Sequence, residues 1–339
     1  MKQQYYIEGG AAAALTRYFA KTKKQIEAEL SKFISSLSQL ELHPQIEYAV
    51  LSEGKRFRPI LAILSAQSVG GTRNKVMPLA LAFELMHTAT LVHDDVIDED
   101  EMRRWRLSLY KKWSVSDALL TGDALIALSV DLSSPYGETI LKTVAQSALQ
   151  LCEGEHMDLT GSLSATTEEV YFKKIRGKSA SLCRAAAYCG GISGGGTAAE
   201  ALSLSMFGEN FGVAYQLRDD VLDFTLNGHH LNLEDSKNGR ITLPLIYCYA
   251  TSTPQEKREI EKFLVLVNEN PLKAREKAND VLNLIRIKGA FEHCETKIDE
   301  YLSNALNSLT GLEDTEYKAY LIEMARTLRS WASTYGNKN

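Results

Sequence analysis

The chain has 339 residues, of which 45% are hydrophobic, and a formal net charge of -5 at pH 7. A chain of this length and apolar content buries a substantial core and is not disordered. The negative net charge argues against a general nucleic-acid binder, because neutralising a phosphate backbone requires a basic face. Local basic pockets for small anions remain compatible with this composition.

The cysteines and the N-terminus indicate the cellular compartment. The five cysteines show neither a paired metal-ligand spacing nor a secretory context. The N-terminal stretch carries Glu8 and no long apolar run, and no segment reaches the roughly 18 to 20 apolar residues that a bilayer requires. We therefore expect a reduced, cytoplasmic protein without a transmembrane segment.

Helical periodicity dominates the chain. Apolar residues recur at i, i+3, i+4 and i+7 in stretches such as 79–92 and 119–132, and alternating strand patterns are nearly absent. We predict an all-α fold of roughly ten to thirteen helices, forming one domain over residues 1–339. The breaks between helices are too short to be interdomain linkers and fall at 70–71, 133–135, 190–196 and 252–254.

Two aspartate clusters of nearly the same form lie about 125 positions apart, Asp94-Asp95-Val96-Ile97-Asp98 and Asp219-Asp220-Val221-Leu222-Asp223. In a helix the first and last aspartates of each cluster project from one face. Both clusters follow apolar stretches, in which carboxylates need partners. Six carboxylates brought together repel one another unless divalent cations and a polyanion share the site, and Mg²⁺ is commonly held by carboxylates and substrate phosphates. The sequence therefore predicts a diphosphate bound through Mg²⁺.

Basic residues occur in three places that suit the same ligand. Lys55-Arg56-Phe57-Arg58 precedes a predicted helix, and arginine can grip phosphate oxygens with two hydrogen bonds. Arg103-Arg104 closely follows the first aspartate cluster, and Lys178-Ser179 places a cation beside a hydroxyl. His87 stands two helical turns before Asp94 on the same side of the predicted helix.

These motifs resemble those of the trans-isoprenyl diphosphate synthases, of the geranylgeranyl and geranylfarnesyl type, in kind and in order. The resemblance runs from about residue 50 to residue 245. It rests on Glu84 to Asp98, Gly54-Lys55-Arg56-x-Arg58-Pro59, Arg103-Arg104, Lys178-Ser179, Gln216 before Asp219-Asp220-x-x-Asp223, and Thr242-Leu243-Pro244.

The resemblance implies a homodimeric, isoprenoid synthase type bundle around a deep cavity, with the two aspartate clusters facing each other across its mouth. It also implies that an allylic diphosphate, held by two to three Mg²⁺ per site, ionises and is attacked by isopentenyl diphosphate. The implied metal ligands are Asp94, Asp95, Asp98, Asp219, Asp220 and Asp223. The residues implied to bind isopentenyl diphosphate are Lys55, Arg58, His87 and Arg104. The residues implied on the allylic side are Arg103, Lys178, Ser179 and Gln216, and the last three of these are predicted to be catalytic. His230 and Arg240 are also predicted to bind substrate.

The chain departs from the family pattern at two places. Trp105-Arg106-Leu107-Ser108 stands where the family has Gly-x-Pro-Thr or Gly-x-Pro-Ser, so we expect a different turn, because glycine permits positive φ. His230 stands in place of a lysine that caps the allylic diphosphate, and it is a weaker, pH-dependent cation.

Product length should depend on the side chains one, two and three turns before Asp94, because a helical turn rises about 5.4 Å, close to one isoprene unit. Ala89 and Thr90 are small and leave room for the growing chain. Met86 or Phe83 is therefore expected to form the floor of the cavity, the side chain that stops growth, and C20 to C25 products are expected. Replacing Ala89 with Phe should shorten the product.

Two other functions remain open from the sequence. Terpene cyclases ionise the same diphosphates but need no site for a second one, whereas this chain retains Lys55, Arg58, His87 and Arg104. A non-catalytic subunit of a heteromeric synthase is the alternative that is not an enzyme, and the irregular 105–107 and 229–233 segments agree with it. Such subunits usually lose an aspartate cluster, and this chain keeps both.

Overall fold

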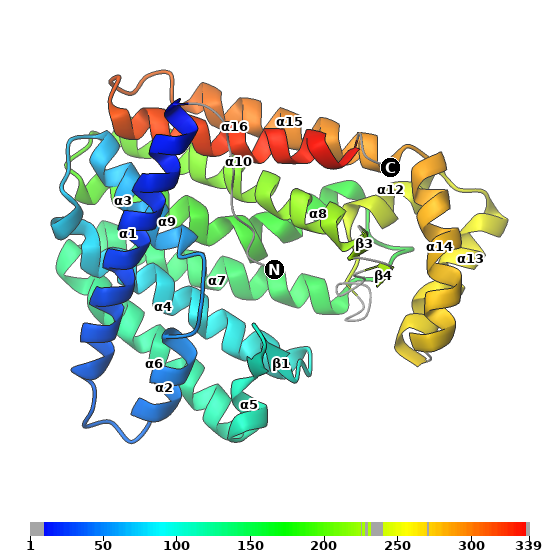
Figure 1. Cartoon of the computed structure of the whole chain (residues 1–339), viewed down its shortest axis with the longest axis horizontal. Coiled ribbons are helices and arrows are strands. Elements are labelled where there is room, and N and C mark those ends of the chain that lie inside the picture. Colours follow the sequence, from blue (N-terminus) through cyan, green and yellow to red (C-terminus); the bar gives the residue numbers. More distant parts are fainter. Residues whose placement is uncertain (1–9, 225, 228–229, 232–239, 270, 337–339) are drawn as a thin grey trace. The chain divides into compact units, whose positions relative to one another are not determined.

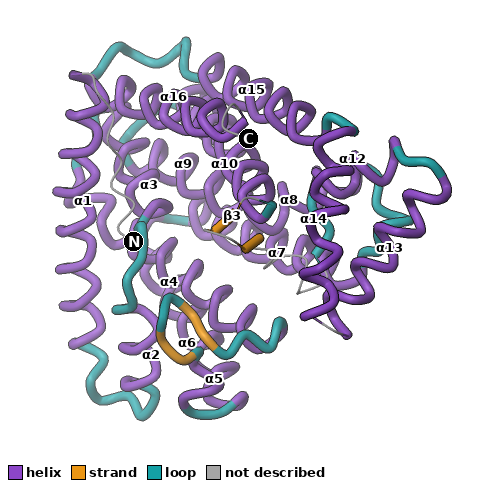
Figure 2. Tube along the Cα trace, turned by 45° about the vertical axis from the view of Figure 1, so that its right-hand side comes forward, coloured by secondary structure: helices purple, strands orange, loops and turns teal. Residues whose placement is uncertain are grey.

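A computed structural model describes residues 10–224, 226–227, 230–231, 240–269 and 271–336. The predicted all-α fold is confirmed within these residues. Figure 2 shows helices along almost the whole described trace, and the described strands form two antiparallel hairpins of two-residue strands. The described chain packs into two compact units, and each is described by itself.

The described residues of the first unit are 10–148, 182–208 and 308–324. In it α1 packs against α2, α3 and α4, while α4 packs against α3 and α6 (Figure 1). Its core is densely apolar, and the side chains of α3 from Pro59 to Ala66 are all buried. Its elements are α1 (Gly10–Ser35), α2 (His43–Val50), α3 (Phe57–Ser68), α4 (Arg73–Ile97), β1 (Met102–Arg103), β2 (Arg106–Leu107), α5 (Leu109–Lys112), α6 (Val115–Ser133) and η1 (Ser134–Tyr136).

The described residues of the second unit fall within 149–181, 209–307 and 325–336. In it α12 packs against α8 and α14, and α13 and α14 form a helical hairpin (Figure 1). Its own elements are α8 (Glu168–Ile175), η2 (Arg176–Ala180), β3 (Leu226–Asn227), β4 (His230–Leu231), α12 (Leu243–Thr251), α13 (Pro254–Glu269) and α14 (Pro271–Ile287).

The remaining helices have residues in both units. They are α7 (Glu138–Thr160), α9 (Ser181–Ser193), α10 (Ala198–Asp223), α15 (Ala290–Ser308) and α16 (Glu316–Gly336). The units therefore do not correspond to consecutive halves of the sequence. That the chain forms one domain over residues 1–339 stays a prediction.

Local sequence explains where several helices begin. Ser114 caps α6, since its hydroxyl accepts the Asp117 N–H at 3.0 Å and donates to the Asp117 carboxylate at 2.6 Å. A reciprocal capping box starts α10, where the Thr197 hydroxyl accepts the Glu200 N–H and the Glu200 carboxylate accepts the Thr197 N–H. The helices predicted over 79–92 and 119–132 lie within α4 and α6.

The glycine-rich stretch 190–196 is only partly the loose connection that was expected. Gly190 lies inside α9, and a Cβ there would approach the Ala62 carbonyl oxygen of α3 to 2.3 Å. Glycine at this position therefore allows close packing of two helices. The connection itself is confined to residues 194–197.

Among the described helices, α4 is long and apolar enough by length and composition to cross a membrane. However, 72% of its most apolar stretch is buried inside the structure, which is typical of a core helix. We therefore assign α4 to the core of the first unit.

Candidate active site

The first aspartate cluster occupies the C-terminal turn of α4. Asp94 and Asp98 lie four residues apart and are half-buried, and the N–H of Asp98 donates to the Asp94 carbonyl at 2.8 Å. The C-terminus of a helix carries partial negative charge, which adds to the repulsion between these carboxylates. This turn therefore favours a bound cation.

Asp95, the middle aspartate, already has a protein partner. Its side chain is buried, and its Oδ1 accepts a hydrogen bond from Arg103 Nε at 2.6 Å. Burial raises the pKa of Asp95, and the Arg103 guanidinium partly offsets that rise. Asp95 thus holds Arg103 next to the two half-buried aspartates of the cluster.

Arg103 and Arg104 belong to a tight hairpin in which β1 pairs with β2. Arg104 and Trp105 form its two-residue turn, with φ values of 52° and 66°. We predicted a different turn because Trp105 replaces a glycine that permits positive φ, yet Trp105 itself adopts positive φ. A two-residue turn that follows the twist of the strands places both central residues at positive φ, which Arg104 and Trp105 adopt despite the strain that a Cβ brings there.

The basic run before α3 contains one buried and two more accessible cations. Arg56, at φ 51°, donates to Glu84 Oε1 at 2.5 Å and to the carbonyls of Val50 and Ser52 at 3.0 and 2.6 Å. The Arg56 side chain therefore holds the loop before α3 against α4. Lys55 is exposed and Arg58 half-buried, which suits the ligand-binding role predicted for them.

Arg104 reaches the same loop from the hairpin. Its Nη1 donates to the Glu53 carbonyl and lies 3.3 Å from the Ser52 hydroxyl. The hairpin and the loop before α3 are thereby linked. Burial lowers the pKa of His87 well below its usual value, and the cations of Arg58, Arg104, Arg103 and Arg56 lower it further. His87 is consequently a neutral imidazole among guanidinium groups. The first unit thus brings together the cations that the sequence predicted in it.

In the second unit, Lys178 and Ser179 lie on a π-helical turn, η2. A Cβ at Gly154 would approach the Lys178 backbone nitrogen to 2.2 Å, so α7 and η2 are in close backbone contact. Single π-turns are frequent at functional sites, because the extra residue redirects the side chains. The sequence predicted the residues of this turn but not its geometry.

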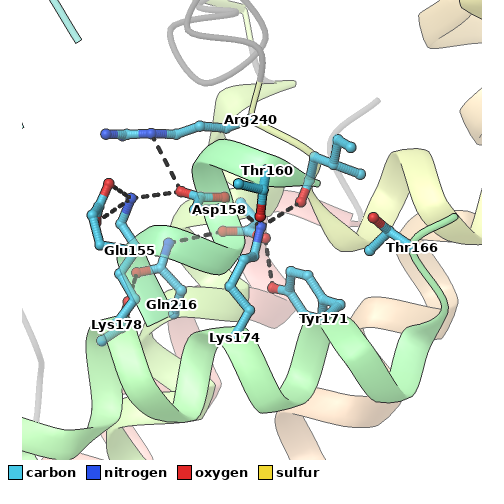
Figure 3. A network of polar contacts seen from close by, with 12 residues as sticks. Glu155, Asp158, Thr160, Thr166, Tyr171, Lys174, Lys178, Gln216 and Arg240 are labelled. Atoms are coloured by element: carbon cyan, nitrogen blue, oxygen red, sulfur yellow. Dashed lines mark hydrogen bonds and ion pairs between the residues drawn. The ribbon is translucent and has the colours of Figure 1, made fainter. Parts of the chain in front are cut away.

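Lys178 points into a network of buried charges (Figure 3). Its ammonium lies 2.5 Å from Asp158 Oδ2 and 3.0 Å from Glu155 Oε1, and both carboxylates come from α7. Asp158 also accepts a hydrogen bond from Lys174 at 2.7 Å, and Arg240 Nε lies 3.6 Å from its Oδ2. Burial alone would raise the pKa of Asp158, but the two lysines hold it below its usual value.

The second aspartate cluster ends α10 and is tied to the same turn. The Ser179 hydroxyl donates to Gln216 Oε1 at 2.7 Å, and Gln216 Nε2 donates to Asp220 Oδ1 at 2.9 Å. The Tyr171 hydroxyl donates to Asp220 Oδ2 at 2.6 Å. Asp219 is half-buried and pairs with Arg218 at 2.7 Å. The second unit thus brings Lys178, Ser179, Gln216 and Asp220 together.

Asp223 completes the cluster and is buried in the last turn of α10. Among the residues that the structure describes, no group of three or more His, Cys, Asp or Glu side chains is arranged to hold a metal ion by itself. His230 lies in β4, but its side chain and residues 228–229 and 232–239 lie outside the described part of the chain. The prediction for His230 stays a prediction.

Comparison with known proteins identifies the family of the chain. The sequence model of the family described as "Polyprenyl synthetase" matches residues 39–284. The chain belongs to the polyprenyl synthetase family. The predicted resemblance to the trans-isoprenyl diphosphate synthases is therefore confirmed, and so is the class of enzyme, a chain-elongating trans-prenyltransferase.

Relatives within the polyprenyl synthetase family differ in their named products. The chain is 33% identical over 294 residues to octaprenyl diphosphate synthase of Escherichia coli, a match that covers 85% of this chain and 90% of that protein. It is 37% identical over 229 residues to geranylfarnesyl diphosphate synthase of Methanosarcina mazei, covering 68% and 77% respectively. These relatives establish the family, but because their products differ in length they do not establish the product length of this chain.

Solved structures of the polyprenyl synthetase family share the fold. A polyprenyl synthase from Caulobacter crescentus, in complex with calcium and isoprenyl diphosphate, superposes with a TM-score of 0.83 at 27% identity and covers 96% of this chain and 99% of that one. A geranylgeranyl pyrophosphate synthetase from Pyrococcus horikoshii gives a TM-score of 0.83 at 26% identity, covering 93% and 97%.

Several residues that build the site were not predicted from the sequence. Glu155 and Asp158 are carboxylates three residues apart on α7, a weak signal by itself, and Tyr171 and Lys174 are three residues apart on α8. Arg56 and Glu84 were part of the quoted motifs, but no role was assigned to them. Each acts through a partner distant in sequence, which spacing alone does not reveal.

Proposed function

We propose that this protein condenses isopentenyl diphosphate with an allylic diphosphate in an E-configured, head-to-tail 1′-4 reaction. The allylic C–O bond breaks to give pyrophosphate and an allylic cation, the double bond of isopentenyl diphosphate attacks that cation, and loss of a proton leaves a longer allylic diphosphate. The observation that carries the proposal is the presence of two separate sets of cations, one in each unit, alongside both aspartate clusters. A terpene cyclase needs only one diphosphate site.

The first unit supplies the proposed isopentenyl diphosphate subsite. Lys55, Arg58 and Arg104 offer the positive charge, and His87 offers a hydrogen bond from a neutral ring. The contacts of Arg104 with Ser52 and Glu53 fix that guanidinium before substrate arrives. Such preorganisation reduces the entropy lost when the diphosphate binds.

The second unit supplies most of the proposed allylic subsite. Lys178 and Arg240, together with Arg103 of the first unit, would stabilise the charge that develops on the departing diphosphate. The Ser179 hydroxyl and the Gln216 amide offer weak dipoles for the allylic cation and are fixed by their mutual hydrogen bond. That the two aspartate clusters face each other across one cavity remains part of this proposal.

The carboxylates fit Mg²⁺. The chemistry of the donor set is that of a hard cation, and the two half-buried aspartates of α4 lie in a helical turn that favours positive charge. Protein sites for Mg²⁺ commonly use one or two carboxylates with substrate phosphates, so no cage of protein ligands is required. The similar Caulobacter structure contains calcium, another oxygen-preferring divalent cation, with isoprenyl diphosphate. We propose two to three Mg²⁺ per site on Asp94, Asp95, Asp98, Asp219, Asp220 and Asp223.

When bound, Mg²⁺ neutralises diphosphate charge and acts as a Lewis acid on the leaving group. Asp95 and Asp220 have a second task in the protein. They orient Arg103 and Gln216 through the hydrogen bonds described above. Their replacement should therefore disturb the neighbouring side chains as well as metal binding.

We further propose products of C20 to C25, made by a cytoplasmic homodimer. Thr90 lies one turn before Asp94 and is half-buried, so it does not block growth at that level. Met86 and Phe83, two and three turns before Asp94, are large, buried side chains of α4, and one of them provides the proposed floor. Ala89 is fully buried as well, so Phe at 89 would also disturb the core.

The deciding experiment incubates the purified protein with radiolabelled isopentenyl diphosphate, farnesyl diphosphate and Mg²⁺, followed by chain-length analysis of the dephosphorylated products. We expect linear all-E alcohols longer than the primer. Cyclic hydrocarbon instead of linear product would indicate a terpene cyclase. Absence of any product from the folded protein would indicate a subunit that requires a partner chain, and both results contradict the proposal.

A further inference from the structure

Asp158 stands out in the second unit because it is a carboxylate surrounded by cations that are proposed to bind a diphosphate (Figure 3). Its side chain is only 5% exposed and lies in the last turn of α7. It contacts Lys174 of α8 at 2.7 Å, Lys178 of η2 at 2.5 Å and Arg240 at 3.6 Å. One carboxylate of α7 therefore connects the continuous α8–η2 segment with the segment that carries Arg240.

A carboxylate at this place cannot attract a diphosphate, because the two carry like charge. Its contribution must therefore come through the cations that it holds. Lys178 and Arg240 have long, flexible side chains, which lose much rotamer freedom when they are fixed. A buried anion that fixes both of them removes this cost from the binding step.

Asp158 also reaches the backbone that carries Arg240. Lys174, held by Asp158, donates a second hydrogen bond to the Ile241 carbonyl at 2.9 Å. Two residues further on, the Leu243 N–H points at Asp220 Oδ2 at 3.5 Å. The segment that presents Arg240 is thus tied at one end to the Asp158 network and at the other to the second aspartate cluster.

We propose that Asp158 is a positioning residue for the allylic diphosphate, acting through Lys178 and, by way of Lys174 and Ile241, through Arg240. This inference rests on the proposed function, which supplies the allylic substrate. Asp158 makes no contact with the substrate itself in this account. Glu155, at 3.0 Å from Lys178, helps to hold Lys178 but is not part of the route to Arg240.

The sign of the effect of Asp158→Asn separates positioning from simple electrostatics. The substitution keeps the shape of the side chain but removes one negative charge beside the diphosphate site. By Coulomb's law alone the allylic diphosphate should then bind more tightly. If Asp158 works by positioning, the allylic diphosphate should bind more weakly, because Lys178 and Arg240 are no longer fixed.

The experiment compares Asp158→Asn with Glu153→Gln, which removes the same charge from an exposed position on the same helix. We expect Asp158→Asn to raise the KM for farnesyl diphosphate about tenfold or more, as for a lost hydrogen bond to a charged group. The KM for isopentenyl diphosphate should change less than about twofold, within the scatter of surface effects. Glu153→Gln should leave both values unchanged. A lowered or unchanged KM for farnesyl diphosphate, or an equal rise in both, would overturn the proposal.

A double-mutant cycle tests whether Asp158 acts through Lys178. In a Lys178→Met background, Asp158→Asn should raise the farnesyl diphosphate KM by a clearly smaller factor than in the wild type, because one of its two routes is already lost. Additive effects would contradict the assigned route. Should Asp158→Asn lower the melting temperature too far for kinetics, Glu155→Gln removes the other carboxylate that holds Lys178. A smaller rise is then expected in the same KM, and no rise would count against positioning through Lys178.

Direct binding separates this inference from the proposed function. Calorimetric titration of inorganic pyrophosphate with Mg²⁺ into each variant needs no turnover. Weaker binding by Asp158→Asn than by Glu153→Gln supports the positioning role, even if the wild type fails to condense the two substrates. Equal binding by the two variants would reject the positioning role and leave the proposed function standing if the wild type is active.

Discussion

Glu84 and Asp158 are both buried carboxylates that hold cations, Glu84 next to one proposed diphosphate subsite and Asp158 within the other. Glu84 contacts Arg56 at 2.5 Å, and both side chains are less than 5% exposed. Arg56 in turn donates to the carbonyl of Val50, which ends α2, and to that of Ser52, in the loop that carries Lys55. Removing either carboxylate leaves a buried cation without its counter-charge, which is costlier than losing a surface pair.

The Glu84–Arg56 pair gives the first prediction. Glu84→Gln should lower the free energy of unfolding by about 3 kcal/mol, as for other buried pairs that lose one partner. Urea denaturation with the midpoint and slope both fitted measures this loss. Glu138→Gln, which breaks an exposed pair with Lys142, is the control and should leave stability unchanged. Equal stability of the two variants would show that Arg56 does not depend on Glu84.

His87 predicts a pH dependence of stability. Its folded-state pKa is depressed by burial and by the guanidinium groups of Arg58, Arg104, Arg103 and Arg56, so the unfolded chain binds the proton more readily. Its contribution is therefore fully present above the ordinary histidine pKa of about 6.5 and is lost as the pH falls below that value. Urea denaturation at pH 7.5 and 5.0 should show a larger loss for the wild type than for His87→Gln.

An exposed histidine provides the control for that experiment. His156→Gln on α7 should lose the same stability as the wild type between the two pH values. Parallel pH profiles for the wild type and His87→Gln would contradict the neutral state assigned to His87.

At the scale of elements, side chains of α4 are proposed to set the product length. Asp94 and Thr90 lie four residues apart on one face, and Thr90 is half-buried. Thr90→Phe should place a ring one turn below the aspartates and stop growth near C15, since one turn rises about 5.4 Å. Reversed-phase analysis of the dephosphorylated products measures this, and Thr90→Ser should keep the wild-type product. An unchanged product for Thr90→Phe would exclude α4 as the wall that sets the length.

The sequence was sufficient for the elements with strong periodicity and for charges that lie close together in the chain. It predicted the helices within α4 and α6, and it predicted that both aspartate clusters end up on helices. It did not predict the Asp158 network, because Asp158, Lys174 and Arg240 are spread over more than 80 positions. The π-turn at Lys178 and the left-handed Trp105 were also missed, because the first depends on tertiary packing and the second on the hairpin twist.

At the scale of the whole molecule, one surface of α6 is expected to lie in the interface of the proposed homodimer. Leu120, Ala127 and Val130 lie along one face of this helix and are exposed, with Leu119 and the charged Asp123 beside them. Apolar patches of this kind are uncommon on monomers and often mark interfaces. Leu120→Glu should therefore convert a dimer into monomers in light scattering coupled to gel filtration. Leu202→Glu, at an exposed leucine of α10, should remain dimeric. A wild type that is monomeric at micromolar concentration would contradict the dimer.

The most direct test of the central claim measures pyrophosphate release against Mg²⁺ concentration for the wild type, Asp94→Asn, Asp219→Asn and the double variant. If both clusters hold one diphosphate through the metal, each single variant should lose at least about 100-fold in kcat, in line with several kcal/mol from metal catalysis. The double variant should fall little further, because residues that act as a unit are not additive. Full activity in either single variant, or in the wild type without divalent cation, would contradict the account.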